Sequence, residues 1–287
     1  MILTNENYYS DIANQEYMSV SQYKSFCECE AATMAQLNGE WERPSTTAQL
    51  VGSYIDSWFE GTLEEFCVRN KDSIYTQASL KKQKAFFETH PEVAAEEPLK
   101  GLVLLEDFKK ADGIIEFLQK DPTFMRYMSG KKQVIITFEL FGCLWKAKID
   151  SNHPDKIVDL KIMKSMDRVM GKSFVEYWGY DTQMAAYAAG RGDDPCTYLA
   201  VATKQNPPAK AIVSIPKWRR EECLDEIKRN MPRILAVKSG KVPPRRCERC
   251  EYCRATHIIT DPIDFEMVGL SPAERGAIFG LQYAPEA

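Results

Sequence analysis

The chain has 287 residues and carries 37 Lys and Arg against 41 Asp and Glu, so its formal net charge is −4. Hydrophobic residues make up 44 % and charged residues 27 %, which is ordinary for a globular protein and excludes a disordered chain, a collagen-like repeat and a coiled coil. The longest apolar runs are too short to cross a bilayer, and the first residues lack the basic-then-apolar layout of a signal peptide, so we expect a cytoplasmic protein with no membrane segment.

The first part of the sequence has helical patterns. Ser19 to Gln22 has the form of a capping box and Gly39 is suited to close a helix, which predicts one helix over residues 19–39. A second helix starts at Ser45 or Thr46 and ends at Gly61, because its apolar residues follow helical spacing. Residues 80–128 indicate further helices, broken near three prolines. We therefore expect an N-terminal helical elaboration, with a helical insertion over residues 62–130.

The pattern changes to strands beyond residue 130. Residues 133–140 and 143–150 are rich in β-branched and aromatic side chains, and Phe141-Gly142 between them predicts a tight turn. The remaining elements follow in the order strand 156–161, helix 173–189, strands 197–203 and 210–215, and helix 217–238. This order predicts an α/β fold with a mixed central sheet flanked by helices, in a single domain over residues 1–287.

Basic residues are distributed unevenly along the chain. Residues 204–254 hold 14 Lys and Arg against 6 Asp and Glu, and residues 131–172 hold 9 against 5. A solvated basic face and a surface that binds a polyanion both fit this distribution. The charge alone leaves both interpretations open.

Two carboxylates and a lysine are expected at neighbouring strand ends. Asp150 ends one strand, and Asp159 and Lys161 lie two residues apart on the next, so their side chains share one face. Burying them unpaired would be costly, whereas Asp150, Asp159 and the backbone carbonyl of Leu160 suit a hard cation such as Mg²⁺. Such an ion activates water against a phosphate, and Lys161 would orient that water or stabilise the developing charge. The alternative is a turn flanked by solvated charges.

Three of the nine cysteines form a tight cluster near the end of the chain. Cys247, Cys250 and Cys253 lie within a loop at residues 244–257, and three thiolates at this spacing supply three of the four ligands of a tetrahedral metal site. In a reducing compartment, clustered cysteines more often bind a metal than form disulfides. Thiols without a metal are the alternative.

Four stretches, taken in order, resemble the PD-(D/E)xK nuclease superfamily, and more specifically its RecB-type exonucleases, which include phage RecE-like proteins. Ser19–Cys29 resembles the opening helix, Gly52–Glu60 the segment Gly-x-x-x-His-x-x-x-Glu, Lys148–Asp150 with Asp159–Lys161 the nuclease core, and Gln183–Tyr187 the helix motif Gln-x-x-x-Tyr. Asp56 stands here where the family has histidine. The resemblance implies a restriction-endonuclease-like core.

The resemblance also implies an activity. It implies a deoxyribonuclease that depends on Mg²⁺ or Mn²⁺ and digests double-stranded DNA from its ends, as in phage recombination and DNA repair. Asp56 would join Asp150 and Asp159 as a metal ligand, and Lys164, Arg168 and Lys172 would contact the DNA backbone. The residues implied in catalysis are Asp150, Asp159, Lys161, Gln183 and Tyr187. A core aromatic at Tyr187 and a surface charge at Glu60 are the alternatives for those two positions.

Cofactors, partners and competing functions complete these expectations. By resemblance, Cys29 joins the three clustered cysteines around a [4Fe–4S] cluster, while zinc completed by Cys29, Cys27 or His257 is the alternative. A single-strand annealing protein and a homo-oligomer are implied as partners. Two other functions remain open on the same fold. One is a catalytically inactive module that binds DNA ends or assembles with partners, its chemistry lost through Asp56, and the other is a DNA endonuclease.

Overall fold

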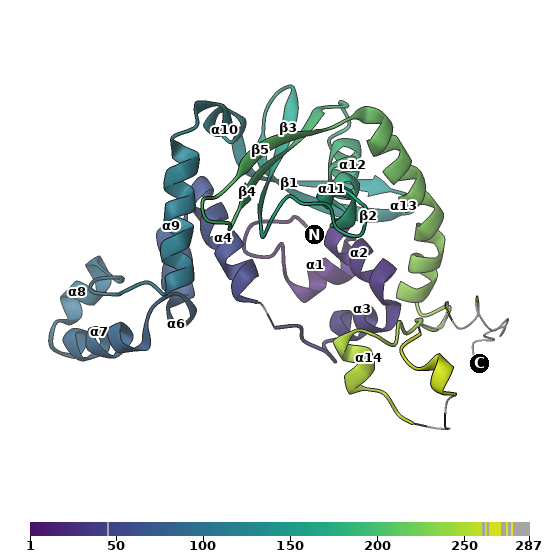
Figure 1. The fold of residues 1–287 in the computed structure, drawn as a ribbon, viewed down its shortest axis with the longest axis horizontal. Helices are drawn as coiled ribbons and strands as arrows, with labels where there is room; N and C mark the ends of the chain where they lie inside the picture. Colours follow the sequence, from purple (N-terminus) through teal and green to yellow (C-terminus); the bar gives the residue numbers. More distant parts are fainter. Residues whose placement is uncertain (45, 260–261, 263, 271–273, 275–276, 278–287) are drawn as a thin grey trace. The chain divides into compact units, whose positions relative to one another are not determined.

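A computed structural model of the chain describes residues 1–44, 46–259, 262, 264–270, 274 and 277 (Figure 1). The chain divides into two compact units. The first unit comprises residues 1–43, 137–146 and 224–287, and the second comprises residues 44–136 and 147–223. Within the described residues, no helix combines the length and the apolar character that crossing a membrane requires.

A mixed five-stranded sheet provides the framework. Its strands lie in the order β1-β2-β3-β4-β5; β3 and β4 are parallel, whereas the β2–β3 and β4–β5 pairs are antiparallel. The strands are β1 (Lys131–Leu140), β2 (Cys143–Asn152), β3 (Lys156–Met163), β4 (Cys196–Thr203) and β5 (Lys210–Ile215). A parallel pair needs a crossover connection, and helices α11 and α12 supply it between β3 and β4. The predicted mixed sheet is confirmed.

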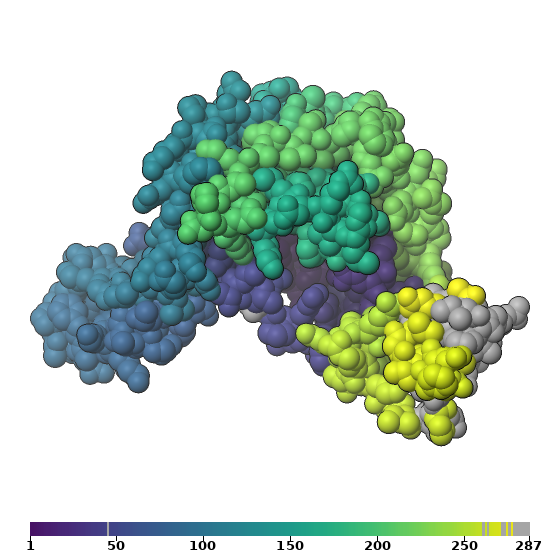
Figure 2. All heavy atoms as spheres, viewed as in Figure 1, coloured from purple at the N-terminus to yellow at the C-terminus, as the bar shows by residue number. Residues whose placement is uncertain are grey.

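In the second unit, one group of helices packs on one face of the sheet. Val158 and Leu160 of β3 and Ala200 and Ala202 of β4 share a core with these helices. The helices that share this core are α4 (Thr47–Glu60), α5 (Leu63–Arg69), α6 (Lys71–Ile74), α9 (Glu106–Gln119) and α10 (Pro122–Tyr127). Helix α7 (Gln77–Thr89) reaches it only through the half-buried Leu80, and α8 (Pro91–Glu96) contributes no residue to it. In this unit, α7 and α8 lie beyond one end of α9, away from the sheet (Figures 1 and 2). Residues 62–130 are thus rich in helix, while their status as an insertion stays a prediction.

Helix α4 forms where its local sequence predicts. Thr46 and Gln49 make a reciprocal capping box at its start, and Gly61 ends it in the left-handed conformation at φ 81°. Ser45, the other start considered, lies outside the described residues. The helix buries Ile55 and Phe59 among its apolar residues, which fixes the rotation of Asp56 and Glu60 about the helix axis.

The opposite face of the sheet carries α11 (Phe174–Tyr177) and α12 (Tyr180–Arg191). Met184 and Ala188 of α12 share a core with Ile157 of β3 and with strand β4. The single helix predicted over residues 173–189 is wrong, because Gly179 adopts a left-handed conformation at φ 62° and separates the two helices.

The first unit contains α1 (Asp11–Glu16), α2 (Val20–Glu28), α3 (Glu30–Leu37), α14 (Glu251–Ala255) and η1 (Phe265–Met267). Helix α13 (Lys217–Lys238) begins in the second unit and continues into the first. The single helix predicted over residues 19–39 is wrong, because Cys29 is extended at φ −162° and ψ 105°. Ser19 caps α2, but the side chain of Gln22 donates to the Asn14 carbonyl instead of completing the box.

Residues 137–146 form the hairpin of the first unit. Phe141 and Gly142 both have positive φ, at 48° and 87°, as the predicted tight turn requires. Beyond the turn, Lys146 is buried, and its ammonium donates to the Tyr8 carbonyl at 2.5 Å and to Asn14 Oδ1 at 2.7 Å. Burial lowers the pKa of Lys146 to about 8. These bonds join the N-terminal segment to the hairpin.

Candidate active site and metal centre

Strand β3 brings Asp159 and Lys161 together in the second unit. Asp159 is 2 % exposed, and its Oδ2 lies 2.5 Å from the Lys161 ammonium. Apart from this ion pair, Oδ2 has no hydrogen-bond partner among the described residues. The other oxygen accepts a 2.6 Å hydrogen bond from the Gln183 amide of α12. The predicted shared face of Asp159 and Lys161 therefore carries a charged pair that α12 holds in place.

Asp150 of β2 precedes the residues that pair with β3, and its side chain contacts the β3 backbone. The two strands pair at Ser151 with Val158 and at Asn152 with Ile157. Asp150 Oδ2 accepts the backbone N–H of Leu160 at 2.8 Å, and Gln133 of β1 donates to Oδ1 at 3.5 Å. The Asp150 carboxylate is thereby held beside Leu160, whose backbone carbonyl is the other predicted metal ligand on β3.

Helix α4 supplies a third carboxylate. Asp56 Oδ1 is buried without a hydrogen bond. Burial, with the negative charges of Glu60 and Asp159, raises the pKa of Asp56 to about 7. Burial, with Asp159 and Asp56, likewise raises the pKa of Asp150 well above its usual range. We call Asp56, Asp150 and Asp159 the carboxylate centre; its excess negative charge suits a divalent cation.

Lys161 is the cation that pairs with Asp159 in this site. Burial lowers the pKa of Lys161, but the attraction of Asp159 and Asp150 outweighs burial and leaves that pKa above its ordinary value. The ammonium also lies 5.1 Å from the centre of the Tyr180 ring. Lys161 thus remains charged, as a group that stabilises developing negative charge must be.

The remaining predicted residues lie in different surroundings. Tyr187 is half-buried and packs against the core beneath α12. Lys164, Arg168 and Lys172 are exposed in the segment that follows β3. There Val169 and Lys172 pair across a tight turn, and the Arg168 guanidinium donates to the Gly171 carbonyl at 2.8 Å. A substrate role for these four residues stays a prediction.

Three residues near the centre were missed in the sequence. Gln133 contacts Asp150, and Tyr180 lies beneath Lys161. Lys132 is close enough for Asp150, Asp56 and Glu60 to raise its pKa, although burial outweighs them and lowers it. Lys132 and Gln133 lie at the start of β1, the strand beside the one that carries Asp150. Their position in the predicted hairpin was the signal that could have placed them near the site. Gln133 has a positive φ of 49°, a strained conformation that the sequence does not reveal.

A second cluster, which we call the thiolate centre, consists of Cys29, Cys247, Cys250 and Cys253 in the first unit. Within the described residues, it is the group of His, Cys, Asp or Glu side chains already gathered closely enough to hold an ion, with all four sulfurs within 4.8 Å of one another. The carboxylate centre is less tightly gathered. Neither Cys27 nor His257 belongs to the thiolate group.

The sulfur separations indicate how the thiolate centre can bind a metal. Cys29 Sγ and Cys247 Sγ lie 3.6 and 4.0 Å from Cys253 Sγ. A tetrahedral zinc site with Zn–S bonds of about 2.3 Å has sulfurs about 3.8 Å apart, so these residues fit a single ion. A [4Fe–4S] cluster also takes four thiolates, but each thiolate binds a different iron atom of the cluster. The four cysteine sulfurs would therefore have to move apart to hold it.

Backbone amides already support the thiolates. The N–H groups of Ala32, Cys250 and Cys253 donate to Cys29, Cys247 and Cys250 at 3.5, 3.3 and 3.4 Å. Burial raises the pKa of Cys29 to about 12. For Cys247, the amides of Arg249 and Cys250 outweigh burial and lower the pKa to about 7. This site therefore contains at least one thiol that ionises readily, as metal binding requires.

The geometry of β2, β3, α4 and α12 can be compared with known proteins. A family model described as "PDDEXK-like domain of unknown function (DUF3799)" matches residues 19–256. The chain belongs to this PDDEXK-like family. The expected restriction-endonuclease-like fold is confirmed, and so is the expectation of a nuclease, a hydrolase of phosphodiester bonds.

Solved structures support the same assignment. A crystal structure from Eubacterium rectale, of a protein provisionally named an exonuclease, is 42 % identical, with a TM-score of 0.82 over 94 % of this chain and 100 % of that chain. A structure named SSO0001 is 12 % identical over 81 % of this chain and 90 % of that one, and its TM-score of 0.25 supports no conclusion. Among curated proteins, none is similar enough to match.

Proposed function

We propose that this nuclease is a Mg²⁺-dependent exonuclease that digests double-stranded DNA from its ends, of the kind used in phage recombination. The observation that carries the proposal is the 2.5 Å pair of Asp159 and Lys161, held by Gln183 beside the crowded carboxylates Asp150 and Asp56. The provisional name of the Eubacterium rectale relative supports the exonuclease assignment.

The carboxylate centre fits the divalent metal that this chemistry uses. Asp56 has a buried oxygen without a hydrogen bond, and burial, reinforced by repulsion from neighbouring carboxylates, raises the pKa of both Asp56 and Asp150. Asp56, Asp150, Asp159 and the Leu160 carbonyl would hold the ion, all of them hard oxygen ligands. When bound, the metal polarises the scissile phosphate and lowers the pKa of the attacking water.

The side chains around the centre have distinct tasks. Lys161 keeps a positive charge at the reacting phosphate, where it offsets the negative charge that develops as water attacks. Gln183 fixes the orientation of Asp159 and so keeps one carboxylate oxygen directed at Lys161. Lys164, Arg168 and Lys172 supply exposed cations that bind the phosphate backbone without reading sequence.

The thiolate centre has a structural task in this proposal. Its four sulfurs would hold zinc, which their separations favour, or a [4Fe–4S] cluster, which the family resemblance implies. Either metal would join α2 and α3 to the loop of α14. Metal analysis with a visible absorption spectrum distinguishes them, because only the iron cluster absorbs in the visible range. An annealing partner, a homo-oligomer and a cytoplasmic location remain part of the proposal.

The test compares end-labelled linear duplex DNA with closed circular duplex DNA, using the purified full chain with and without Mg²⁺. We expect digestion of linear DNA only, and only with Mg²⁺ or Mn²⁺. Cutting of the closed circle would replace the proposal with an endonuclease. Binding of ends without cleavage under Mg²⁺, Mn²⁺ and Co²⁺ would replace it with an inactive end-binding module.

A further inference from the structure

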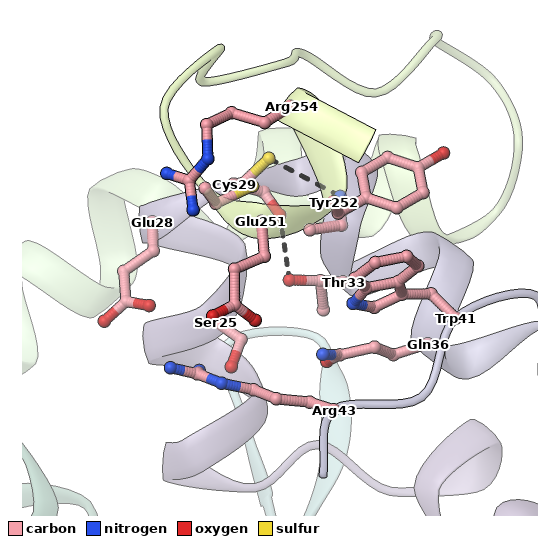
Figure 3. Close-up of a pocket in the computed structure, with 12 residues that line it drawn as sticks. Ser25, Glu28, Cys29, Thr33, Gln36, Trp41, Arg43, Glu251, Tyr252 and Arg254 are labelled. Atoms are coloured by element: carbon pink, nitrogen blue, oxygen red, sulfur yellow. Dashed lines mark hydrogen bonds between the residues drawn. The ribbon is translucent and has the colours of Figure 1, made fainter. Parts of the chain in front are cut away.

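A pocket of about 230 Å³, with both polar and apolar lining, lies against the thiolate centre in the first unit (Figure 3). Cys29 and Cys250 form part of its wall. Gln36, Trp41 and Arg43 come from α3 and the segment after it, whereas Glu251, Tyr252 and Arg254 come from α14 (Figure 3). Cys250 caps the start of α14 and Cys253 lies within it. A metal bound by these two cysteines would therefore fix α14, which forms one wall of the pocket.

The lining combines an aromatic surface with unused polar groups. The Trp41 and Tyr252 rings meet edge to face with centroids 5.6 Å apart. Within the described residues, the side chains of Gln36, Trp41 and Arg43 have no hydrogen bond or ion pair. Donors and acceptors beside an aromatic wall suit a planar heteroaromatic ring, which stacks by its face and hydrogen-bonds by its edge.

Size and charge narrow the class of ligand. Sites for drug-sized molecules usually measure about 300–1,000 Å³, so this smaller pocket suits a single base. Glu28 and Glu251 offset Arg43 and Arg254 in the lining, which disfavours a free phosphate inside the pocket. Outside the lining, the Arg246 guanidinium lies over the Tyr252 ring and donates to the Cys253 carbonyl and the Thr256 hydroxyl, and Arg249 pairs with Glu274. Arg245, exposed on the same loop, would supply a cation for a phosphate beside such a base.

We propose that this pocket binds one unpaired nucleobase of single-stranded DNA, stacked on Trp41. The proposal rests on the proposed function in one respect, that the chain acts on DNA and exposes a single strand. It also gives the thiolate centre a second role, because the metal that joins α2, α3 and α14 would shape a binding site for single-stranded DNA.

The test measures binding of a short poly(dT) carrying one 2-aminopurine, with the metal-loaded full chain and no added Mg²⁺ or Mn²⁺. We expect wild-type protein to change the 2-aminopurine fluorescence, as stacking does. Because stacking on one aromatic side chain contributes roughly 1–3 kcal/mol per base, Trp41→Ala should weaken binding by about 5- to 150-fold. Gln36→Ala should weaken it less, by removing edge contacts.

Trp218→Ala is the matched control, because Trp218 is an equally large aromatic, 61 % exposed, outside the pocket. Metal content and thermal unfolding equal to wild type show that Trp41→Ala is folded. Binding by Trp41→Ala equal to wild type, or an equal loss in Trp218→Ala, overturns the inference. If wild-type protein cleaves duplex DNA but does not bind poly(dT), the pocket inference is wrong while the proposed function stands. If it binds poly(dT) but does not cleave duplex DNA, only the proposed function is wrong.

Discussion

The carboxylate centre and the thiolate centre each combine a ligand from an early helix segment with ligands from much later in the chain, yet they are prepared for metal in opposite ways. At the thiolate centre, three backbone amides already donate to the sulfurs. At the carboxylate centre, like charges crowd one another and a buried Asp56 oxygen has no hydrogen bond. The first arrangement suits a permanent structural ion, and the second suits an exchangeable ion used in chemistry.

The largest effect should follow from Asp159→Ala. The change removes the ion-pair partner of Lys161 and the acceptor for Gln183, so we expect DNA hydrolysis to fall by about 10³-fold or more in kcat, as removal of a central catalytic group usually does. Metal at the thiolate centre should remain at wild-type content, because no ligand there is touched. Unchanged digestion of linear duplex would show that chemistry occurs elsewhere.

Cys253→Ser should affect stability rather than chemistry. Cys253 is 2 % exposed and its sulfur contacts those of Cys29 and Cys247, so its loss should empty the thiolate centre. Because a structural metal stabilises the folded chain, we expect a decrease of several kcal/mol in unfolding free energy, measured by denaturant unfolding with metal analysis.

Cys27→Ser provides the matched control for that experiment. Cys27 is exposed and lies two residues from Cys29 but outside the thiolate group. Full metal content and wild-type stability are expected. If Cys27→Ser loses the metal while Cys29→Ser keeps it, the assignment of the fourth ligand is wrong.

Gln183→Ala should have an intermediate effect on activity. It deletes the 2.6 Å bond that orients Asp159, and loss of a residue that orients a metal ligand typically costs about 10- to 100-fold in activity or metal affinity. Steady-state kinetics at several Mg²⁺ concentrations measures both. Gln133→Ala, which removes only a 3.5 Å bond to Asp150, should cost less; the reverse order would assign the orienting role to β1.

The smallest expected effect is that of Asp56→Asn on the stability of the metal-free protein. This variant should be more stable than wild type at neutral pH, whereas Cys253→Ser should be less stable. Because the pKa of Asp56 is raised to about 7, the folded state resists ionisation that the unfolded chain undergoes above about pH 4. Metal-free wild-type protein should therefore lose stability as pH rises from about 4 to about 7, and Asp56→Asn should lose less.

Thermal unfolding of metal-free protein across this range tests the sign. A higher Tm for Asp56→Asn by a few degrees at pH 8, with no difference near pH 4, is expected. Equal stability at both values would mean that the carboxylates do not strain the metal-free fold. Mg²⁺-dependent hydrolysis should nevertheless fall in this variant, since an amide is a weaker ligand than a carboxylate.

Local sequence determined most of the helices and strands and the faces on which several candidate site residues lie. The capping box of Thr46 and the left-handed Gly61 are decided by neighbours a few residues away. Helical and strand spacing also determined the faces of Asp56, Asp159 and Lys161. The order of helices and strands likewise predicted the mixed sheet.

Tertiary structure decided how these elements bend and which side chains meet. Local preference alone would carry a helix through Cys29, but the chain is extended there, and its thiol lies 3.6 Å from that of Cys253 across 224 positions of sequence. The strained Gln133 and the bond from Gln183 to Asp159 arise in the same way. Spacing determines which face a side chain occupies, whereas its partner across the fold depends on packing and electrostatics that no local pattern contains.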